Sequence, residues 1–224
     1  MRIALMIPTL CRADLLKEAV EPLLRHRETF CQFVVIDNGP QDLKWVTDAG
    51  IGLYLPGKNL GFGRSCNWAI QNMLVDTGAD WLMVHSDDIV LSDDTLRLLP
   101  SICELHKDAW LVRSKASFSV FLMSRAGAEA SRYAPGKHFD ESFWPAQFED
   151  ADLEWRLQLL DRDKVVMREP DLFPEVWRRQ SSKGGIPNWR GHRHNNRSRF
   201  LAKWGAIRTA NRYKVAFNGE IPWP

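Results

Sequence analysis

The sequence predicts an α/β fold with a mostly parallel central sheet flanked by helices. In the first half of the chain, short apolar runs typical of buried strands alternate with segments whose apolar residues recur at helical spacing. Hydrophobic residues make up 45% and charged residues 26% of the 224 residues, which is typical of a globular protein with a substantial core. We therefore expect one ordered domain, with ligands bound beyond the carboxyl ends of the strands.

The individual elements are expected where these patterns begin and end. Strands are expected at residues 2–8, 32–37, 51–56, 81–85, 117–124 and 164–169. Helices are expected at residues 13–26, 63–76, 93–106, 148–163 and 195–214. The last of these helices is too polar for a core helix, so we expect it in an extension that packs on the domain.

The composition divides the single domain, residues 1–224, into three parts. Residues 1–114 carry the alternating pattern, residues 115–174 change character, and residues 175–224 form a C-terminal extension rich in Trp, Arg, Gly and Asn. The four cysteines are widely spaced without a C-x-x-C pair, as is typical of reduced thiols. No apolar stretch is long enough to cross a bilayer, and Pro8 breaks the first one, so we expect a soluble, cytoplasmic protein.

The C-terminal extension is strongly basic although the net charge of the chain is only +2. Between residues 175 and 214 the only acid is Glu175, and the bases are Arg178, Arg179, Lys183, Arg190, Arg193, Arg197, Arg199, Lys203, Arg208, Arg212 and Lys214. Such a segment suggests an anionic partner: a pyrophosphate, an anionic membrane surface or a nucleic acid. His192 and His194 flank Arg193, where they could ligate a metal, although contact with phosphate or solvent is the simpler interpretation.

Two pairs of aspartates follow the buried strand 81–85. Asp93 and Asp94 come after a turn, so we interpret them as first-turn residues that cap the helix 93–106 and pair with its dipole. Asp87 and Asp88 end the strand itself, at the mouth of the expected crevice. They form either a solvated turn or a site for a hard cation such as Mn²⁺ or Mg²⁺.

Two further segments could carry chemistry. Residues 57–70, GKNLGFGRSCNWAI, place three glycines before a helix, where backbone and a helix N-terminus could approach an anion; since neither G-x-G-x-x-G nor a Walker pattern occurs, a plain loop stays open. Residues 147–157, QFEDADLEWRL, gather four acids where a helix begins. Acids are expected there for the helix dipole, and Glu149 and Asp152, three positions apart on one face, could also hold a basic residue. One of them could also be a general base, because like-charged neighbours raise its pKa.

Taken in order, these stretches resemble the family-two inverting glycosyltransferases with the GT-A fold. IPTLCR is similar to their opening strand, VVIDNG to the second strand, and NLGFGRSCNWAI to an Asn-x-Gly-x-Gly-x-x-x-Asn segment. HSDDIVL stands where their DxD motif lies, FDESFWPAQFEDADLEWRL resembles their acceptor-side motifs, and NNRSRFLAKWG resembles a helix near their end. The resemblance covers nearly the whole chain and implies a Rossmann-like GT-A sheet with a basic helical extension.

The resemblance implies a metal-dependent hexosyl- or pentosyl-transferase that uses Mn²⁺ or Mg²⁺. Residues 1–114 would bind a UDP-, GDP- or dTDP-linked sugar, and residues 115–174 would hold the acceptor and the catalytic groups. The implied catalytic residues are Asp150, as the base, and Glu149, and the implied metal ligand is Asp88, with His192 and His194 as further candidates. The implied nucleotide-sugar contacts are Pro8, Thr9, Arg12, Asp37, Asn38, Asn59, Gly61, Gly63, Arg64, Asn67 and Asp87.

Two departures from the family pattern keep the metal site open. Ser86 stands where the DxD motif would begin, and the segment that in relatives often supplies a histidine here contains Arg178 and Arg179. Either an arginine replaces part of the metal's role or one of the two histidines of the extension does.

Three functions follow. The first is a transferase of surface polysaccharide or glycan synthesis, acting on a glycan acceptor. The second is a phage-type glycosyltransferase acting on modified DNA bases, because Trp177, Trp189 and Trp204 are interleaved with arginines that could hold a nucleic-acid backbone. The third is a catalytically silent module that binds a nucleotide sugar, suggested by Ser86 and the missing histidine.

Overall fold

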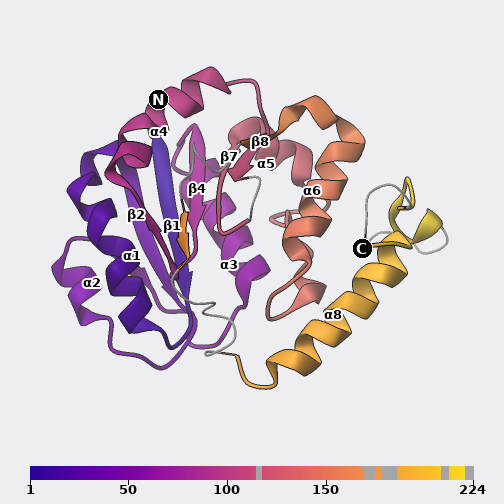
Figure 1. Cartoon of the computed structure of the whole chain (residues 1–224), viewed down its shortest axis with the longest axis horizontal. Helices are drawn as coiled ribbons and strands as arrows, with labels where there is room; N and C mark the ends of the chain where they lie inside the picture. Colours follow the sequence, from indigo (N-terminus) through magenta and orange to yellow (C-terminus); the bar gives the residue numbers. More distant parts are fainter. Residues whose placement is uncertain (115–117, 169–174, 178–185, 208–211, 220–224) are drawn as a thin grey trace.

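The chain forms three layers with a seven-stranded sheet in the middle, in the order β3-β2-β1-β4-β7-β6-β8 (Figure 1). The computed structural model describes residues 1–114, 118–168, 175–177, 186–207 and 212–219. The strands are β1 (Ile3–Thr9), β2 (Phe30–Asp37), β3 (Gly52–Tyr54), β4 (Trp81–His85), β5 (Ile89–Leu91), β6 (Leu111–Ser114), β7 (Val120–Ser124), β8 (Val165–Arg168) and β9 (Glu175–Trp177).

The pairing of the strands confirms the predicted mostly parallel sheet. β1 pairs in parallel with β2 on one side and β4 on the other, and β7 runs antiparallel to β4 and β6. The register sets Thr9 of β1 opposite Asp37 of β2, so both residues lie at the carboxyl edge of the sheet. β5 pairs with β9 in a separate two-stranded sheet that the sequence did not predict. Strand β6, which ends at residue 114, and strand β7, which begins at residue 120, are neighbours in the large sheet. The two expected parts, residues 1–114 and 115–174, therefore contribute strands to one sheet.

Helices cover both faces of the sheet. They are α1 (Ala13–Arg25), α2 (Lys44–Asp48), α3 (Phe62–Ala69), α4 (Asp93–Leu105), α5 (Arg125–Ser131), α6 (Glu149–Leu160) and α8 (Trp189–Trp204). Helices α1, α2 and α4 pack with one face of the sheet, and α3, α5 and α6 with the other. In Figure 1, α8 is the outermost element, beyond α6. Within the described part of the chain, no helix combines the length and the apolar character that a membrane span requires.

Local sequence explains where α4 and α5 begin, because Ser92 and Ser124 cap them. α4 starts after Ser92, whose hydroxyl accepts a hydrogen bond from the backbone N–H of Thr95 at 3.2 Å. Asp93 and Asp94 occupy the first turn, as expected, and the cap itself is the serine. α3 continues into a π-helical segment, Ile70–Val75, so the helix predicted at residues 63–76 is confirmed with a change of winding.

Helix α8 differs most from its prediction. It begins at residue 189 and ends at Gly205, which has a φ of +72°, rather than running from 195 to 214. Its buried face joins Phe200 and Trp204 to Phe143 and Trp155 in a third apolar cluster. The helix therefore has a core-facing side, although its sequence is polar.

Candidate active site

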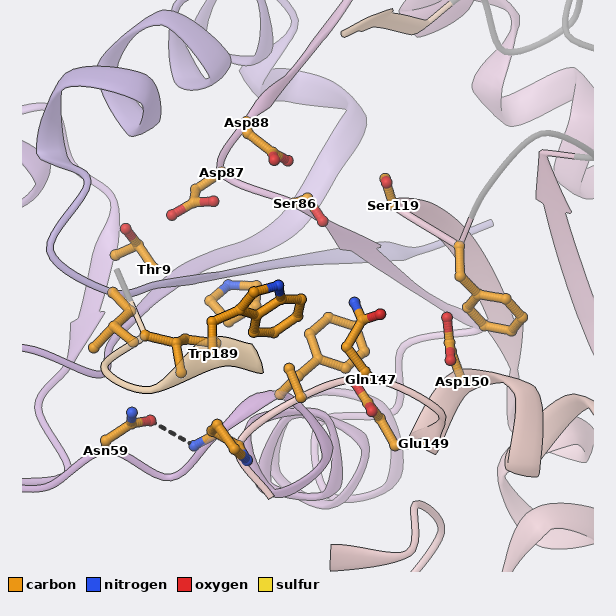
Figure 2. Close-up of a pocket in the computed structure, with 18 of the residues that line it drawn as sticks. Thr9, Asn59, Ser86, Asp87, Asp88, Ser119, Gln147, Glu149, Asp150 and Trp189 are labelled. Atoms are coloured by element: carbon orange, nitrogen blue, oxygen red, sulfur yellow. Dashed lines mark hydrogen bonds between the residues drawn. The ribbon is translucent and has the colours of Figure 1, made fainter. Parts of the chain in front are cut away.

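A cavity of about 580 Å³ opens at the carboxyl edge of the sheet (Figure 2). The end of β1, the turn after β4, the start of α3, the loop before α6 and the start of α8 all contribute to its wall. This is where ligands of open α/β sheets bind. The sequence led us to expect that the turn after residue 36 and the turn after residue 85 converge on one crevice; the second turn lines this cavity through Asp87 and Asp88, whereas Asp37 and Asn38 of the first turn are absent from its lining.

Four carboxylates line this cavity in two pairs. Asp87 and Asp88 lie on the turn between β4 and β5, and Glu149 and Asp150 are the first residues of α6. Figure 2 shows the two pairs on different sides of the cavity, with the side chain of Trp189 between them. About sixty residues separate the pairs in the sequence, and the fold brings them to one cavity.

Burial gives the α6 pair unusual acid–base properties. Burial raises the pKa of Glu149 well above its ordinary range, and the charge of Asp150 raises it further. Burial also raises the pKa of Asp150, but hydrogen bonds from the backbone, including one of 2.8 Å from the N–H of Ala151, and the charge of Arg113 oppose that rise. Burial therefore favours the protonated form of both carboxyls, and the opposing interactions favour the ionised form of Asp150.

One oxygen of the Glu149 carboxyl has no hydrogen-bond partner among the described residues. This atom, Oε2, is buried, and the same holds for the hydroxyl of Thr9 at the end of β1. Both residues line the cavity. A buried polar atom without a partner is costly, so these two atoms are suited to bind polar groups of a ligand.

The loop before α6 is held in a left-handed backbone conformation. Gln147 and Phe148 have φ values of 86° and 78°, which is unfavourable for side chains of this size. The amide of Asn196 in α8 donates to the carbonyls of Phe143 at 2.7 Å and Ala146 at 2.9 Å. Helix α8 therefore holds the loop that presents Gln147 and the acids to the cavity.

A buried lysine attaches α8 to α6 and to the segment before it. The ammonium of Lys203 is fully buried and lies 2.9 Å from Asp140 Oδ2, and it also pairs with Asp152 of α6. Asp152 further accepts hydrogen bonds from Trp204 Nε1 at 2.9 Å and from Arg156 Nε at 3.0 Å. Asp140 and Asp152 thus have structural partners, and neither lines the cavity.

The structure sorts the predicted site residues into two groups. Those that line the cavity are Pro8, Thr9, Asn59, Gly61, Asp87, Asp88, Glu149 and Asp150. Those absent from its lining are Arg12, Asp37, Asn38, Gly63, Arg64, Asn67, His192 and His194. Among the first group, Gly61 is required by its φ of +76° and because a Cβ there would lie 2.6 Å from the carbonyl oxygen of Pro145.

Several residues of the second group hold the site together. Asn67 donates to the carbonyl of Phe139 at 3.0 Å and accepts from the backbone N–H of His138 and of Phe139. Asn38 accepts from the N–H of Leu60 at 3.0 Å and donates to a serine of α3. These two asparagines fix the position of the loops around the cavity.

The remaining residues of that group have local partners. Asp37 accepts from Gly39 N at 3.0 Å, and Arg12 lies 3.3 Å from Asp14 in the first turn of α1. Gly63 lies in α3, where a Cβ would meet Phe139 at 3.5 Å. Their assignment to the nucleotide sugar stays a prediction.

The two histidines predicted as metal ligands do not meet Asp88 in this structure. His192 lines a neighbouring cavity and packs edge-on against Trp144 at 5.2 Å between ring centroids, and His194 is exposed. Arg178 and Arg179 lie outside the described residues. The metal role of the histidines has no support from the geometry and stays a prediction.

Sequence reasoning missed several residues of the cavity. Gln147, Ser119, Trp189 and Arg193 contribute to its lining. Arg193 and Trp189 had a signal in the sequence, because both belong to the basic, Trp-containing stretch. The guanidinium group of Arg193 brings a positive charge to a cavity that otherwise carries four acids.

Comparisons with known proteins were made by sequence and by structure. No protein-family model matches the sequence, and no curated protein matches it significantly. Among solved structures, the mannosyltransferase PcManGT from Pyrobaculum calidifontis, in complex with GDP-Man and Mn²⁺, has a TM-score of 0.59 and 14% identity over 90% of this chain and 63% of that chain. TarS of S. aureus has a TM-score of 0.57 and 13% identity over 94% of this chain and 45% of its own.

A third similar structure is glucosyl-3-phosphoglycerate synthase from Mycobacterium tuberculosis in complex with Mn²⁺, UDP-glucose and phosphoglyceric acid. Its TM-score is 0.57 and its identity 13%, over 90% of this chain and 79% of that chain. The chain spans about half the length of the two TarS chains with which it superposes, 56% and 45%. At such identities the likeness shows the fold alone, and it confirms the predicted GT-A fold.

Proposed function

We propose that the protein is a glycosyltransferase that moves a sugar from a nucleotide-diphosphate sugar to an acceptor hydroxyl with inversion. The observation that carries this proposal is the meeting of two acid pairs, one after β4 and one at the start of α6, in the cavity at the sheet edge. Solved structures of the same fold include transferases in complex with GDP-Man or UDP-glucose and Mn²⁺, which supports the same class of donor here.

Asp87 and Asp88 are the residues that would hold a divalent cation. They are only 4% and 8% exposed, and among the described residues no cluster of three His, Cys, Asp or Glu side chains is assembled. Magnesium-type sites commonly use one or two carboxylates and complete their shell with water and substrate phosphates. The donor set therefore fits Mn²⁺ or Mg²⁺ bound with a nucleotide diphosphate, where the ion supplies positive charge to the leaving group.

Asp150 is the general base of the proposed reaction. Its carboxylate takes the proton of the acceptor hydroxyl while that oxygen forms a bond to the anomeric carbon of the sugar. The bond from the anomeric carbon to the diphosphate breaks, and the diphosphate leaves with the electron pair. Arg193 lines the same cavity and helps to neutralise the charge that develops on this leaving group.

Glu149 orients the acceptor rather than taking its proton. Burial and the charge of the neighbouring Asp150 raise the pKa of Glu149 well above its ordinary range, so ionisation of Asp150 favours the protonated form of Glu149. A protonated carboxyl donates one hydrogen bond and accepts others. Two adjacent acids thereby take separate roles, one as base and one as hydrogen-bonding group.

The acceptor of the proposed reaction is a glycan, as in surface polysaccharide synthesis. The direct test is to incubate the protein with UDP-, GDP- and dTDP-linked sugars and Mn²⁺ and to measure release of the free nucleoside diphosphate. We expect release from one donor, strongly increased by a suitable acceptor and strongly reduced in Asp150→Asn. Binding of a donor without release in the presence of any acceptor, with no difference between wild type and Asp150→Asn, would instead identify a silent binding module.

A further inference from the structure

A second cavity of about 540 Å³ shares the lining residue Asn59 with the first. The carbonyl of Asn59 accepts a hydrogen bond from Nε1 of Trp144 at 3.3 Å, and Trp144 lines only the second cavity. The opposite wall is one side of α8, with His192, Asn195 and Arg199 three or four residues apart. None of the carboxylates assigned to the proposed reaction lines this second cavity, which we call the α8 groove.

The α8 groove carries positive charge. Arg64 and Arg199 line it, and among the described residues the only acid in its lining is Glu141. That carboxylate pairs with Lys137 at 2.6 Å as well as with Arg64 at 3.3 Å, so it is already compensated. The groove therefore favours an anion near Arg199.

Hydrogen bonds and ion pairs within the chain hold the wall of the groove in place. Arg199 donates from Nη1 to the carbonyl of Ser142, and Asn196 donates to the carbonyls of the facing loop. Lys203 secures the same helix one turn further on through Asp140 and Asp152. An arginine held in this way loses little side-chain entropy when it binds a phosphate.

An exposed indole completes the groove. Trp144 is 41% exposed, an unusual value for so large an apolar side chain that has both a hydrogen bond and a ring partner. An aromatic face next to amide and guanidinium donors can hold a ring on one side while the donors bind its polar substituents. The volume of about 540 Å³ lies within the range for small-molecule sites.

We propose that the α8 groove binds a phosphorylated sugar unit of the acceptor, beside the unit that receives the new sugar. This inference rests on the proposed glycosyltransferase function and names the class of its acceptor. The ring of the unit lies on Trp144, and its phosphate binds Arg199 and His192. A polynucleotide fits less well, because the exposed Arg190 and Arg197 line neither cavity and do not extend the groove into a track for a phosphate backbone.

The test is calorimetric titration of the protein with glucose 6-phosphate, glucose and a ten-nucleotide single strand of DNA. The variants are Arg199→Gln, Arg197→Gln as the control with the same charge change on the same helix, and Arg193→Gln in the first cavity. We expect glucose 6-phosphate to bind on the order of tenfold more tightly than glucose, and Arg199→Gln to remove most of that difference. Arg197→Gln and Arg193→Gln should bind glucose 6-phosphate as the wild type does.

Three results would overturn this proposal: equal affinity for glucose and glucose 6-phosphate, equal losses in Arg199→Gln and Arg197→Gln, or a loss confined to Arg193→Gln. Tighter binding of the DNA strand, weakened by Arg199→Gln, would assign the groove to nucleic acid instead. Binding of nucleoside diphosphates is measured on the same proteins. If Arg199→Gln retains that binding while it loses glucose 6-phosphate, the variant is folded and the donor site is intact. If the wild type binds glucose 6-phosphate but no nucleoside diphosphate, the proposed transferase function is wrong, whereas the assignment of a phosphosugar site to the α8 groove is supported.

Discussion

Glu149 and Asp150 are adjacent in the sequence, yet their surroundings separate their chemistry. Asp150 accepts a backbone hydrogen bond, and the charge of Arg113 favours its ionised form. Glu149 has one buried carboxyl oxygen without a partner among the described residues. Environments that push the pKa values of two acids apart are a common way to divide acid and base roles. The pair therefore leads to a prediction that distinguishes its members.

Asp150→Asn should lower kcat by about 10²–10⁴-fold, because the general base is lost. Glu149→Gln should keep kcat within roughly tenfold of wild type, since an amide resembles the protonated carboxyl in shape and can still donate a hydrogen bond. Steady-state rates of nucleoside diphosphate release measure both, with Asp94→Asn on the exposed side of α4 as the control. A larger loss for Glu149→Gln than for Asp150→Asn would reverse the assignment.

The pH dependence of the reaction follows from the same residue. A base with a raised pKa stays protonated, and therefore inactive, up to a higher pH than an ordinary aspartate. We expect kcat to fall as the pH drops through this raised pKa, and to be constant above it. The residual activity of Asp150→Asn should lack this fall, and a pH profile identical to that of the wild type would contradict the assignment.

Sequence patterns predicted the acids of the site, but not which residues hold the surrounding loops in place. Asp87, Asp88, Glu149 and Asp150 stand next to strand and helix ends that can be recognised locally. The partners of Asn67 lie more than seventy residues away along the chain, so no local pattern distinguishes a loop-fixing asparagine from a ligand-binding one.

At the scale of elements, α8 shows why a polar helix can belong to a core. Its Lys203 is buried between two carboxylates, one on α6 and one on the segment before it. Burial lowers the pKa of Lys203, and the two carboxylates oppose that shift. Such a cluster is invisible in the helix sequence alone, because the charges that compensate the lysine are contributed by other elements.

Lys203→Met should destabilise the protein by about 3–5 kcal/mol, since it leaves two buried carboxylates without their shared cation. Urea denaturation measures this loss, and Lys214→Met, which removes the same charge from an exposed position, should change little. Equal losses of unfolding free energy in the two variants would show that the buried ion pairs of Lys203 contribute no more to stability than an exposed lysine does.

The same cluster also predicts how the stability of the protein depends on pH. Although burial raises the pKa of Asp140, the charge and hydrogen bond of Lys203 outweigh it, and the net pKa is lowered. A carboxyl whose pKa is lowered by folding contributes stability above its unfolded pKa and loses that contribution as the pH falls. The difference between Lys203→Met and wild type should therefore shrink as the pH drops through the carboxyl range.

At the scale of the whole molecule, the alternating pattern was enough to predict the layers and the parallel pairing. In amphipathic helices such as α1 and α4, the spacing of the apolar residues indicates which face is buried, and the strands β1, β2 and β4 are apolar. The short strand β5 and its partner β9 were missed because three residues carry no period. The second cavity was not predictable either, since its walls come from segments that are distant in the sequence.

The central claim is that the acids after β4 and the cavity around them bind a nucleotide diphosphate with a divalent cation. The most direct measurement is calorimetric titration with UDP, GDP and dTDP, with and without Mn²⁺, on wild type, Asp88→Ala and the exposed control Asp94→Ala. We predict that one diphosphate binds, that Mn²⁺ strengthens this binding, and that Asp88→Ala loses it while Asp94→Ala does not. Absence of binding in the wild type, or equal binding in Asp88→Ala, would contradict the claim.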